Sequence, residues 1–303
     1  MYKKCLVLMC TYNGERYIKQ QIDSIFNQRY CDINIIIYDD KSTDKTLEII
    51  NECKLEYGDR LSVIPNTENR GFANNFIDII YDNKDRDFDF FALSDQDDFW
   101  KPEKVSKAIQ LLDDSKPSLY CSSLLLVDKN LEPIKLFDHR FNRINQYNAS
   151  IQNVCTGCTV VFNKKFTELL NKPKPQIYLH DYWLFLIAYY VGNFVYDENS
   201  YIMYRQHDNN QIGQTKKKKS IVKKIKAAIF EVFKRNIYSH INMLNQFIEY
   251  YGDEISDETL RILKFVTSKK VKNRLQICMS HKYRKFSKKE NLYFKIRVLF
   301  GIN

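Results

Sequence analysis

Two patterns of apolar residues alternate along the first hundred positions. Short apolar runs lie at 5–10, 33–38, 61–64 and 88–93. Between the first two runs, Ile18, Ile22 and Ile25 recur at helical spacing, and further helical segments follow the second and third runs. Short runs rich in β-branched residues are typical of strands buried on both faces. Strands that alternate with helices predict an α/β fold with a parallel, doubly wound sheet.

Polar residues follow each of these predicted strands. They are Thr11-Tyr12-Asn13, Asp39-Asp40, Asn69-Arg70-Gly71 and Asp95-Gln96-Asp97. Parallel strands end at one edge of their sheet, and ligands of such sheets bind beyond that edge. We therefore expect these segments to form one site. Loops are polar in general, but this explains less well why carboxylates follow two separate strands.

The pattern is less regular after residue 100, and a basic stretch divides the chain. Further expected elements are a helix near 104–112, strands at 119–127 and 154–162, a helix opening near His180, and short strands at 193–204. Residues 129–150 look irregular. The lysines at 216–219 precede two amphipathic helical stretches, near 220–251 and 257–280. We expect two domains, residues 1–215 and a basic helical segment at 216–303.

The positive charge of the chain lies in this second segment. The chain has a net charge of +10, and residues 216–303 hold 22 Lys or Arg against 7 Asp or Glu. Basic amphipathic helices bind anionic membranes, although a helical bundle with a solvated basic face fits the pattern equally well. No nucleic-acid-binding motif accompanies the charge, so we expect no nucleic-acid partner. No apolar run is long enough for a transmembrane helix, and the first residues fit a strand better than a signal peptide.

The cysteines favour a reducing compartment. Eight are scattered along the chain, several of them within apolar runs. Scattered thiols of this kind are typical of reduced, buried side chains in a cytosolic protein. Cys155 and Cys158 form a CxxC motif, for which a redox or zinc role is conceivable. No second CxxC is present, and an apolar run follows directly, so we interpret the two as core thiols on a buried strand.

Three carboxylates crowd the end of the fourth predicted strand, at Asp95, Asp97 and Asp98. Like charges at this spacing repel one another unless a cation lies between them. Mg²⁺ and Mn²⁺ prefer oxygen ligands and often bind one or two carboxylates together with substrate phosphates. The sequence therefore predicts a metal–diphosphate site. Asp98 as a cap of the following helix is the simpler alternative.

These motifs together resemble a known family. The matching segments are Cys10-Thr11-Tyr12-Asn13-Gly14, Tyr38-Asp39-Asp40-Lys41-Ser42-Thr43-Asp44, Asn69-Arg70-Gly71-Phe72-Ala73-Asn74-Asn75, Ser94-Asp95-Gln96-Asp97-Asp98, Thr156-Gly157-Cys158, His180-Asp181-Tyr182-Trp183 and Arg205-Gln206-His207. In this order they resemble the family-2 nucleotide-sugar glycosyltransferases of the GT-A fold, most of all the bacterial rhamnosyltransferase-type branch. Each motif is short, but the ordered set is specific and covers residues 5–207.

The resemblance implies roles for individual residues. It places the nucleotide against Thr11, Tyr12, Asn13, Asp39, Asp40, Arg70 and Asp95. It gives Asp97 as the main ligand of a Mn²⁺ or Mg²⁺ cofactor, with Asp95 as a ribose or metal partner. Asp181 corresponds to the family's catalytic base. Chemistry agrees, because an acceptor hydroxyl that attacks a sugar must lose its proton to a nearby base. Asp181 as a plain helix cap is the competing interpretation.

Four further residues of the last two motifs are weaker candidates. His207 is a possible metal ligand, since a neutral imidazole suits Mn²⁺, and surface placement is as compatible with the pattern. Arg205 is a candidate for binding the diphosphate. His180 and Trp183 are candidates for contact with the diphosphate or the acceptor.

The resulting hypothesis is a metal-dependent, inverting glycosyltransferase. Its donor would be a dTDP- or UDP-sugar, with dTDP-rhamnose first, and its acceptor a glycan or lipid-linked intermediate of bacterial surface polysaccharide. We expect a cytoplasmic protein, peripheral at the inner face of the membrane. The alternatives are a sugar nucleotidyltransferase, which usually needs an early basic Gly-rich loop that this chain lacks, and a non-enzymatic membrane- or nucleic-acid-binding scaffold.

Overall fold

The computed structural model describes residues 2–137, 144–206 and 238–300. Its described residues divide into two compact units. The first unit comprises 2–137, 155–174 and 179–206, and the second comprises 144–154, 175–178 and 238–300. The second unit thus takes two short segments from the middle of the chain.

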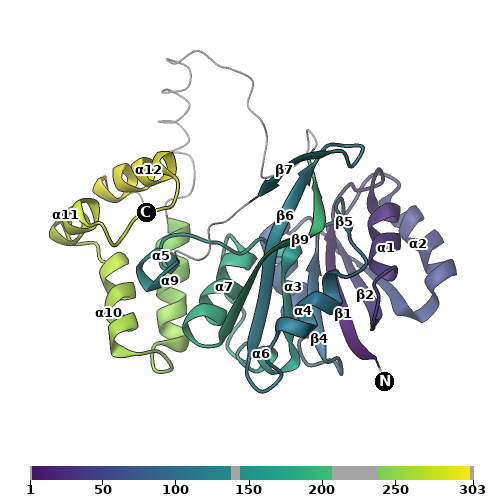
Figure 1. Cartoon of the computed structure of the whole chain (residues 1–303), viewed down its shortest axis with the longest axis horizontal. Helices are drawn as coiled ribbons and strands as arrows, with labels where there is room; N and C mark the ends of the chain where they lie inside the picture. Colours follow the sequence, from purple (N-terminus) through teal and green to yellow (C-terminus); the bar gives the residue numbers. More distant parts are fainter. Residues whose placement is uncertain (1, 138–143, 207–237, 301–303) are drawn as a thin grey trace, which may run out of the picture. The chain divides into compact units, whose positions relative to one another are not determined.

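A parallel half-sheet opens the first unit (Figure 1). Its strands are β1 (Lys3–Thr11), β2 (Cys31–Asp39), β3 (Leu61–Pro65) and β4 (Phe90–Ser94). The connecting helices are α1 (Ile18–Phe26), α2 (Thr46–Tyr57) and α3 (Phe72–Asn83), with a 3₁₀ turn, η1 (Gly58–Arg60), before β3. Thr11 pairs with Asp39 across β1 and β2. The polar residues after these strands therefore start from the same edge of the sheet, as predicted.

Mixed pairing extends the sheet beyond β4. The added strands are β5 (Phe99–Trp100), β6 (Ser118–Val127), β7 (Pro133–Phe137), β8 (Val161–Asn163) and β9 (Asn193–Arg205). The order is β3-β2-β1-β4-β8-β6-β9-β5, and β7 pairs with β6. β6 and β9 are parallel, whereas the pairs made by β5, β7 and β8 are antiparallel. The predicted α/β fold is confirmed, with the antiparallel strands added outside the parallel half.

Helices cover both faces of this sheet. α1, α2 and α4 (Lys104–Leu111) contribute Ile22, Ile50 and Val105 to one core cluster, together with alternate residues of β1, β2 and β4. On the other face, α3 contacts α7 (His180–Tyr190). Burial on both faces explains why the strands are apolar runs without alternation.

Three sequence-based expectations for this unit were wrong. Residues 154–158 form no strand, because a 3₁₀ turn, η3 (Gly157–Thr159), precedes the short β8. Cys155 and Cys158 are nevertheless buried, as expected. The short strands expected at 193–204 form one strand, β9, and β7 arises within a region expected to be irregular. A short helix, α6 (Lys164–Glu168), follows β8, capped by the Asn163 side chain.

The second unit is helical. It contains α5 (Gln146–Ala149), α9 (Tyr238–Tyr251), α10 (Asp257–Val266), α11 (Val271–Met279) and α12 (Lys288–Leu299). Side chains of Ser256 and Ser287 cap α10 and α12. The helix expected over 257–280 is thus two helices, α10 and α11. Of the stretch expected near 220–251, the part from residue 238 is α9, and the part before it lies outside the described residues. Within the described ranges, no helix combines the length and apolar character that crossing a bilayer requires.

Candidate active site

The loop after β4, residues 95–98, contains the crowded carboxylates and is called the carboxylate loop. Gln96 ties it to the first strand-end loop, which follows β1. Gln96 Oε1 accepts hydrogen bonds from Thr11 Oγ1 at 2.5 Å and from the Tyr12 backbone N–H at 2.8 Å, while its Nε2 donates to the Tyr12 carbonyl at 3.0 Å. The side chain also lies where a Cβ on Gly14 would stand. Gln96 thus fixes the two loops to each other, a role that its position between two aspartates did not reveal.

Asn13 joins the first loop to the second, and Asp39 orders the second loop itself. The buried Asp39 carboxylate accepts from the backbone N–H of Ser42 at 2.8 Å and from its hydroxyl at 2.5 Å. Asn13, in the left-handed region at φ +51°, donates its backbone N–H to Ser42 Oγ at 2.8 Å. Asn13 Oδ1 accepts from the Thr43 N–H, also at 2.8 Å. These bonds order both loops at the end of β1 and β2.

Asp40 organises the third loop. Its carboxylate is buried and accepts from the backbone N–H groups of Arg70 at 2.7 Å and Gly71 at 2.9 Å, and from Asn66 Nδ2 at 3.1 Å. The Arg70 side chain, which is partly exposed, pairs with the nearly buried Asp78 at 2.6 Å. The Asp40 carboxylate is therefore engaged in shaping the turn before α3, and any contact with a nucleotide would be additional to that role.

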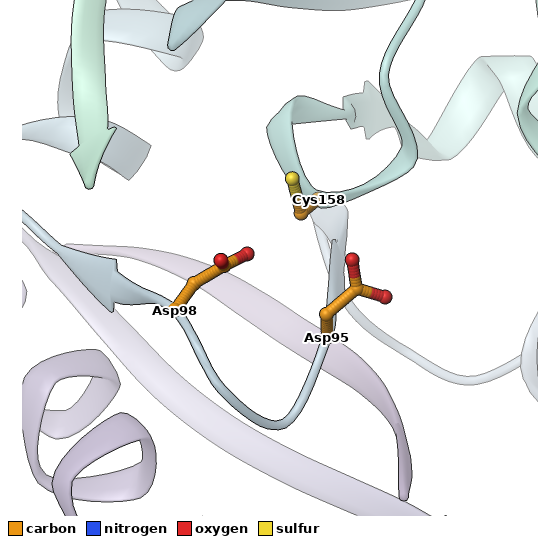
Figure 2. Close-up of side chains that lie close together, drawn as sticks. All are labelled: Asp95, Asp98 and Cys158. Carbon is orange, nitrogen blue, oxygen red and sulfur yellow. The ribbon is translucent and has the colours of Figure 1, made fainter. Parts of the chain in front are cut away.

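The carboxylate loop converges with η3 beneath the sheet edge. Figure 2 shows the side chains of Asp95, Asp98 and Cys158 lying close together. Their potential ligand atoms lie within 4.8 Å of one another. Asp98 is fully buried; its Oδ1 accepts from the Arg205 N–H at 3.3 Å. Among the described residues its Oδ2 meets no oxygen or nitrogen donor, and the weakly donating Cys158 thiol is its neighbour.

The electrostatics of this loop favour a bound cation. Removal from water, and then the charges of Asp97 and Asp181, raise the pKa of the Asp95 carboxyl to about 8. Burial, followed by the charges of Asp97 and Asp95, raises the pKa of Asp98 well above its usual range. Crowded carboxylates and a buried oxygen without a strong donor fit a hard divalent cation, which would offset the repulsion.

The residues gathered here differ in part from the metal ligands that the sequence suggested. Asp95 belongs to the cluster. Asp97 is close enough to shift its pKa but is not one of the three converging groups. Asp98 and Cys158 are its other two members. Sequence reasoning had counted Asp98 among the crowded carboxylates, with a helix cap as the alternative, and had interpreted Cys158 as a core thiol on a strand. His207 lies outside the described residues.

Arg205, the last residue of β9, holds the carboxylate loop in place by hydrogen bonds. Its side chain is buried and donates from Nε to the Asp97 carbonyl at 2.8 Å, from Nη1 to the Lys129 carbonyl at 2.7 Å and from Nη2 to Gln20 Oε1 at 2.6 Å. The guanidinium also lies 4.3 Å from the Tyr17 ring centroid. Because each of its three nitrogens donates to the protein, Arg205 serves here to position the loop.

Asp181 opens α7 on the other side of the cluster. The charge of Asp181 contributes to the raised pKa of Asp95, so the two carboxyls share one region although 86 positions separate them in sequence. Asp181 Oδ1 accepts the Tyr182 N–H at 2.7 Å. A carboxylate at the first turn of a helix is stabilised by the helix dipole. The N-cap residue of α7 is Leu179, so Asp181 is not the cap that the competing interpretation assumed, although a negative charge suits its place in the first turn.

His180 lies behind Asp181 in the core. Its ring is 1% exposed, stacks on Phe76 at 4.1 Å and meets Phe72 edge-on at 5.0 Å. Neither ring nitrogen has a hydrogen-bond partner among the described residues, and burial lowers the pKa of the imidazole to about 3. Trp183 is also fully buried. Both side chains pack inside the fold, so they can affect an acceptor only through the position of α7.

Lys104 is a residue that sequence reasoning missed. It is fully buried at the start of α4, its Nζ lies 3.5 Å from the Trp100 ring centroid, and burial lowers its pKa to about 8. The nearby Cys158, Cys5 and Asp98 act in the opposite direction, which places this ammonium beneath the carboxylate cluster. The helical pattern gave no signal, since a lysine on an amphipathic helix is expected to face water.

Comparison with known proteins identifies the family. The model of glycosyl transferase family 2 matches residues 6–170. The dTDP-rhamnosyl transferase RfbG of Shigella flexneri is 35% identical over 223 residues, which are 68% of this chain and 73% of that protein. The putative teichuronic acid biosynthesis glycosyltransferase TuaG of Bacillus subtilis is 26% identical over 168 residues, 55% of this chain and 65% of TuaG.

Solved structures share the fold at low sequence identity. S. aureus TarS 1-349 in complex with UDP-GlcNAc has a TM-score of 0.54 at 16% identity, covering 98% of this chain and 81% of that one. The mannosyltransferase PcManGT of Pyrobaculum calidifontis, in complex with GDP-Man and Mn²⁺, has a TM-score of 0.54 at 13% identity, covering 100% and 86%. The resemblance inferred from the sequence motifs is confirmed: the chain belongs to glycosyl transferase family 2 and is a glycosyltransferase of the GT-A fold.

Proposed function

We propose that the protein is a metal-dependent, inverting glycosyltransferase that transfers a sugar from a dTDP- or UDP-sugar, with rhamnose the first candidate. The acceptor would be a glycan of bacterial surface polysaccharide, carried on a lipid at the cytoplasmic face of the membrane. One observation carries the proposal. The carboxylates after β4 and the carboxylate that opens α7 share one region at the carboxyl edge of the sheet.

The proposed roles of the site residues follow from the loops in which they lie. Thr11, Tyr12, Asn13 and Asp39, in loops already joined by hydrogen bonds, would hold the nucleotide. Asp95 and Asp97 would hold Mn²⁺ or Mg²⁺ beside the diphosphate. The bound ion would offset the charge that develops on the leaving diphosphate.

Asp181 would complete the reaction on the acceptor side. Its carboxylate would accept the proton of the acceptor hydroxyl as that oxygen attacks the anomeric carbon and the bond to the diphosphate breaks. The side chain is 9% exposed, so little water competes for it. Attack from the face opposite the diphosphate would invert the anomeric configuration.

The relatives support the donor and metal assignments. RfbG is named as a dTDP-rhamnosyl transferase, and the TarS and PcManGT structures are titled as complexes with UDP-GlcNAc and with GDP-Man and Mn²⁺. The 35% identity to RfbG is the reason for placing dTDP-rhamnose first.

A thermal-shift panel tests this proposal. The protein is mixed with dTDP, UDP or GDP, each with and without Mn²⁺. We expect stabilisation by one nucleotide that requires the metal and is lost in Asp97→Ala. Asp59→Ala, in the exposed η1 turn, is the matched control and should behave like the wild type. A metal-independent shift, or full binding by Asp97→Ala, contradicts the proposed site.

A second assay distinguishes glycosyl transfer from the reaction of the enzymatic alternative. A sugar nucleotidyltransferase would release pyrophosphate from a nucleoside triphosphate and a sugar phosphate. We expect no such release, and instead transfer from dTDP-rhamnose to an acceptor with release of dTDP.

A further inference from the structure

Helix α11 has an exposed apolar stripe. Val271, Leu275 and Met279 follow one another at four-residue spacing, so they lie on one face of the helix. They are 64%, 43% and 71% exposed, whereas Ile277 is buried on another face. A helix that packs on one face normally turns polar residues outward. The exposed apolar residues of α11 therefore indicate that this helix contacts a second apolar surface.

Helix α12 has a similar stripe. Leu292, Ile296 and Leu299 recur at helical spacing and are 59%, 37% and 48% exposed, and Phe300, directly after the helix, is 69% exposed. Phe294 and Val298 fill the buried face of the same helix. α11 and α12 contact each other within the second unit, where the Cys278 thiol donates to the Lys295 carbonyl at 3.3 Å. Figure 1 shows them as neighbouring helices. We call these seven exposed residues, together with residues 269–297, the α11–α12 surface.

Basic side chains surround the stripes. Residues 269–297 contain eleven Lys or Arg and one acidic residue, Glu290. The exposed members are Lys269, Lys270, Lys272, Lys282, Arg284, Lys288 and Lys289. Long basic side chains can lie along an apolar surface while their charged ends reach an anionic layer.

The charge pattern selects the partner. We propose that the α11–α12 surface binds an anionic lipid membrane, with the apolar stripes entering the headgroup–acyl boundary and the basic side chains contacting lipid phosphates. A nucleic acid would satisfy the charge but offers no apolar partner for Leu275, Met279 or Leu292. A second copy of the chain would match the apolar residues but bring two strongly basic surfaces together.

Binding of this surface to a membrane would also bring the enzyme close to a lipid-linked acceptor. Delivery of the enzyme to a lipid-linked acceptor rests on that proposed function, whereas lipid binding itself does not. Each can therefore fail separately.

Sedimentation of the full chain with vesicles tests the surface. Phosphatidylcholine vesicles with and without phosphatidylglycerol are compared at low and high salt. We expect binding to the phosphatidylglycerol vesicles alone, weakened by salt. The Leu275→Gln/Leu292→Gln double variant, which keeps every charge, should reduce the partition coefficient about tenfold or more, because both side chains lose their burial in lipid. Lys288→Gln/Lys289→Gln should reduce it by a similar factor.

The control is Leu55→Gln, at an 89% exposed leucine on α2 of the first unit, which should bind vesicles like the wild type. Equal binding to neutral vesicles, no loss in either double variant, or an equal loss in Leu55→Gln overturns the proposal. Preferential binding of an RNA oligonucleotide that competes with vesicles and is insensitive to the leucine changes also overturns it. Nucleotide-dependent thermal shifts, measured on the same variants, report on the first unit independently.

Discussion

Arg205 Nε donates a hydrogen bond to the backbone carbonyl oxygen of Asp97 across 2.8 Å. The last residue of β9 thereby holds the loop after β4, 108 positions earlier in the chain. Burial, followed by the charges of neighbouring carboxylates, raises the pKa of Asp95 and of Asp98 in that loop. Such a loop would spread apart without a backbone restraint, and Arg205 provides one without neutralising the carboxylates directly.

Replacing Arg205 by Lys should therefore loosen the loop. A lysine has one nitrogen and cannot serve the Asp97 carbonyl, the Lys129 carbonyl and Gln20 Oε1 together. We expect a loss of about 2–4 kcal/mol in the free energy of unfolding, because a lysine replaces only one of the three hydrogen bonds that this buried charged group donates. Metal-dependent nucleotide affinity should fall as well. Urea unfolding and nucleotide titration measure the two effects.

Arg29→Lys is the control, because the Arg29 side chain is 63% exposed and forms a surface ion pair with Glu103 across 3.6 Å. It should change stability by less than about 0.5 kcal/mol. If Arg205→Lys were as mild as Arg29→Lys, the restraint on the loop would not depend on the guanidinium.

Asp181→Asn should separate catalysis from binding. The amide keeps a similar shape, and its oxygen can still accept the Tyr182 N–H, but it cannot take up the acceptor proton. We expect kcat to fall by about 10²- to 10⁴-fold while the affinity for the nucleotide stays within a factor of about two. Turnover and calorimetric binding on the same preparation provide the comparison. A variant with nearly unchanged kcat would remove Asp181 from the role of base.

Gly157→Ala should displace the start of α7. A Cβ at this position would lie 2.6 Å from His180 Nε2 and 3.7 Å from Asp181 Cβ. We expect a loss of stability of about 1–3 kcal/mol and a lower kcat, because the ring must move and Asp181 moves with it.

A double-mutant cycle identifies the clash as the cause. His180→Ala removes the ring that the new Cβ would meet, so Gly157→Ala should cost less in that background by about 0.5–3 kcal/mol. Strictly additive effects would show that Gly157 is required for its backbone alone.

The sequence predicted what depends on local periodicity and chain order. β1, β2 and the helix opening at His180 were found because a buried strand and a buried helix each have a short repeat. The shared edge of Asp39 and Asp95 followed from the parallel order alone. The family motifs added the proposed role of Asp181 as the base, which periodicity could not supply.

What was missed depends on contacts between distant segments. β7 forms because it pairs with β6, and its exposed apolar residues have no strong repeat. Cys158 was assigned to a strand because it precedes an apolar run, yet it lies in a tight turn opened by Gly157, and the Cys158 thiol is a neighbour of the Asp98 carboxylate. The restraint by Arg205 and the burial of Lys104 likewise exist only once β9 and α4 pack against the loop.

The buried His180 should make stability depend on pH in a way that one substitution can isolate. Its pKa is lowered from 6.5 to about 3, and burial is the cause. Below pH 6.5 the unfolded chain therefore binds a proton at this histidine, whereas the folded protein binds it only below about pH 3. The free energy of unfolding consequently falls as the pH falls through that window. The slope is about 1.4 kcal/mol per pH unit. His180→Leu cannot titrate, and its unfolding free energy should exceed that of the wild type increasingly from pH 6.5 to pH 4.5, measured by urea unfolding. Parallel curves for the two proteins would mean that His180 is protonated, and hence hydrated or paired, in the native state.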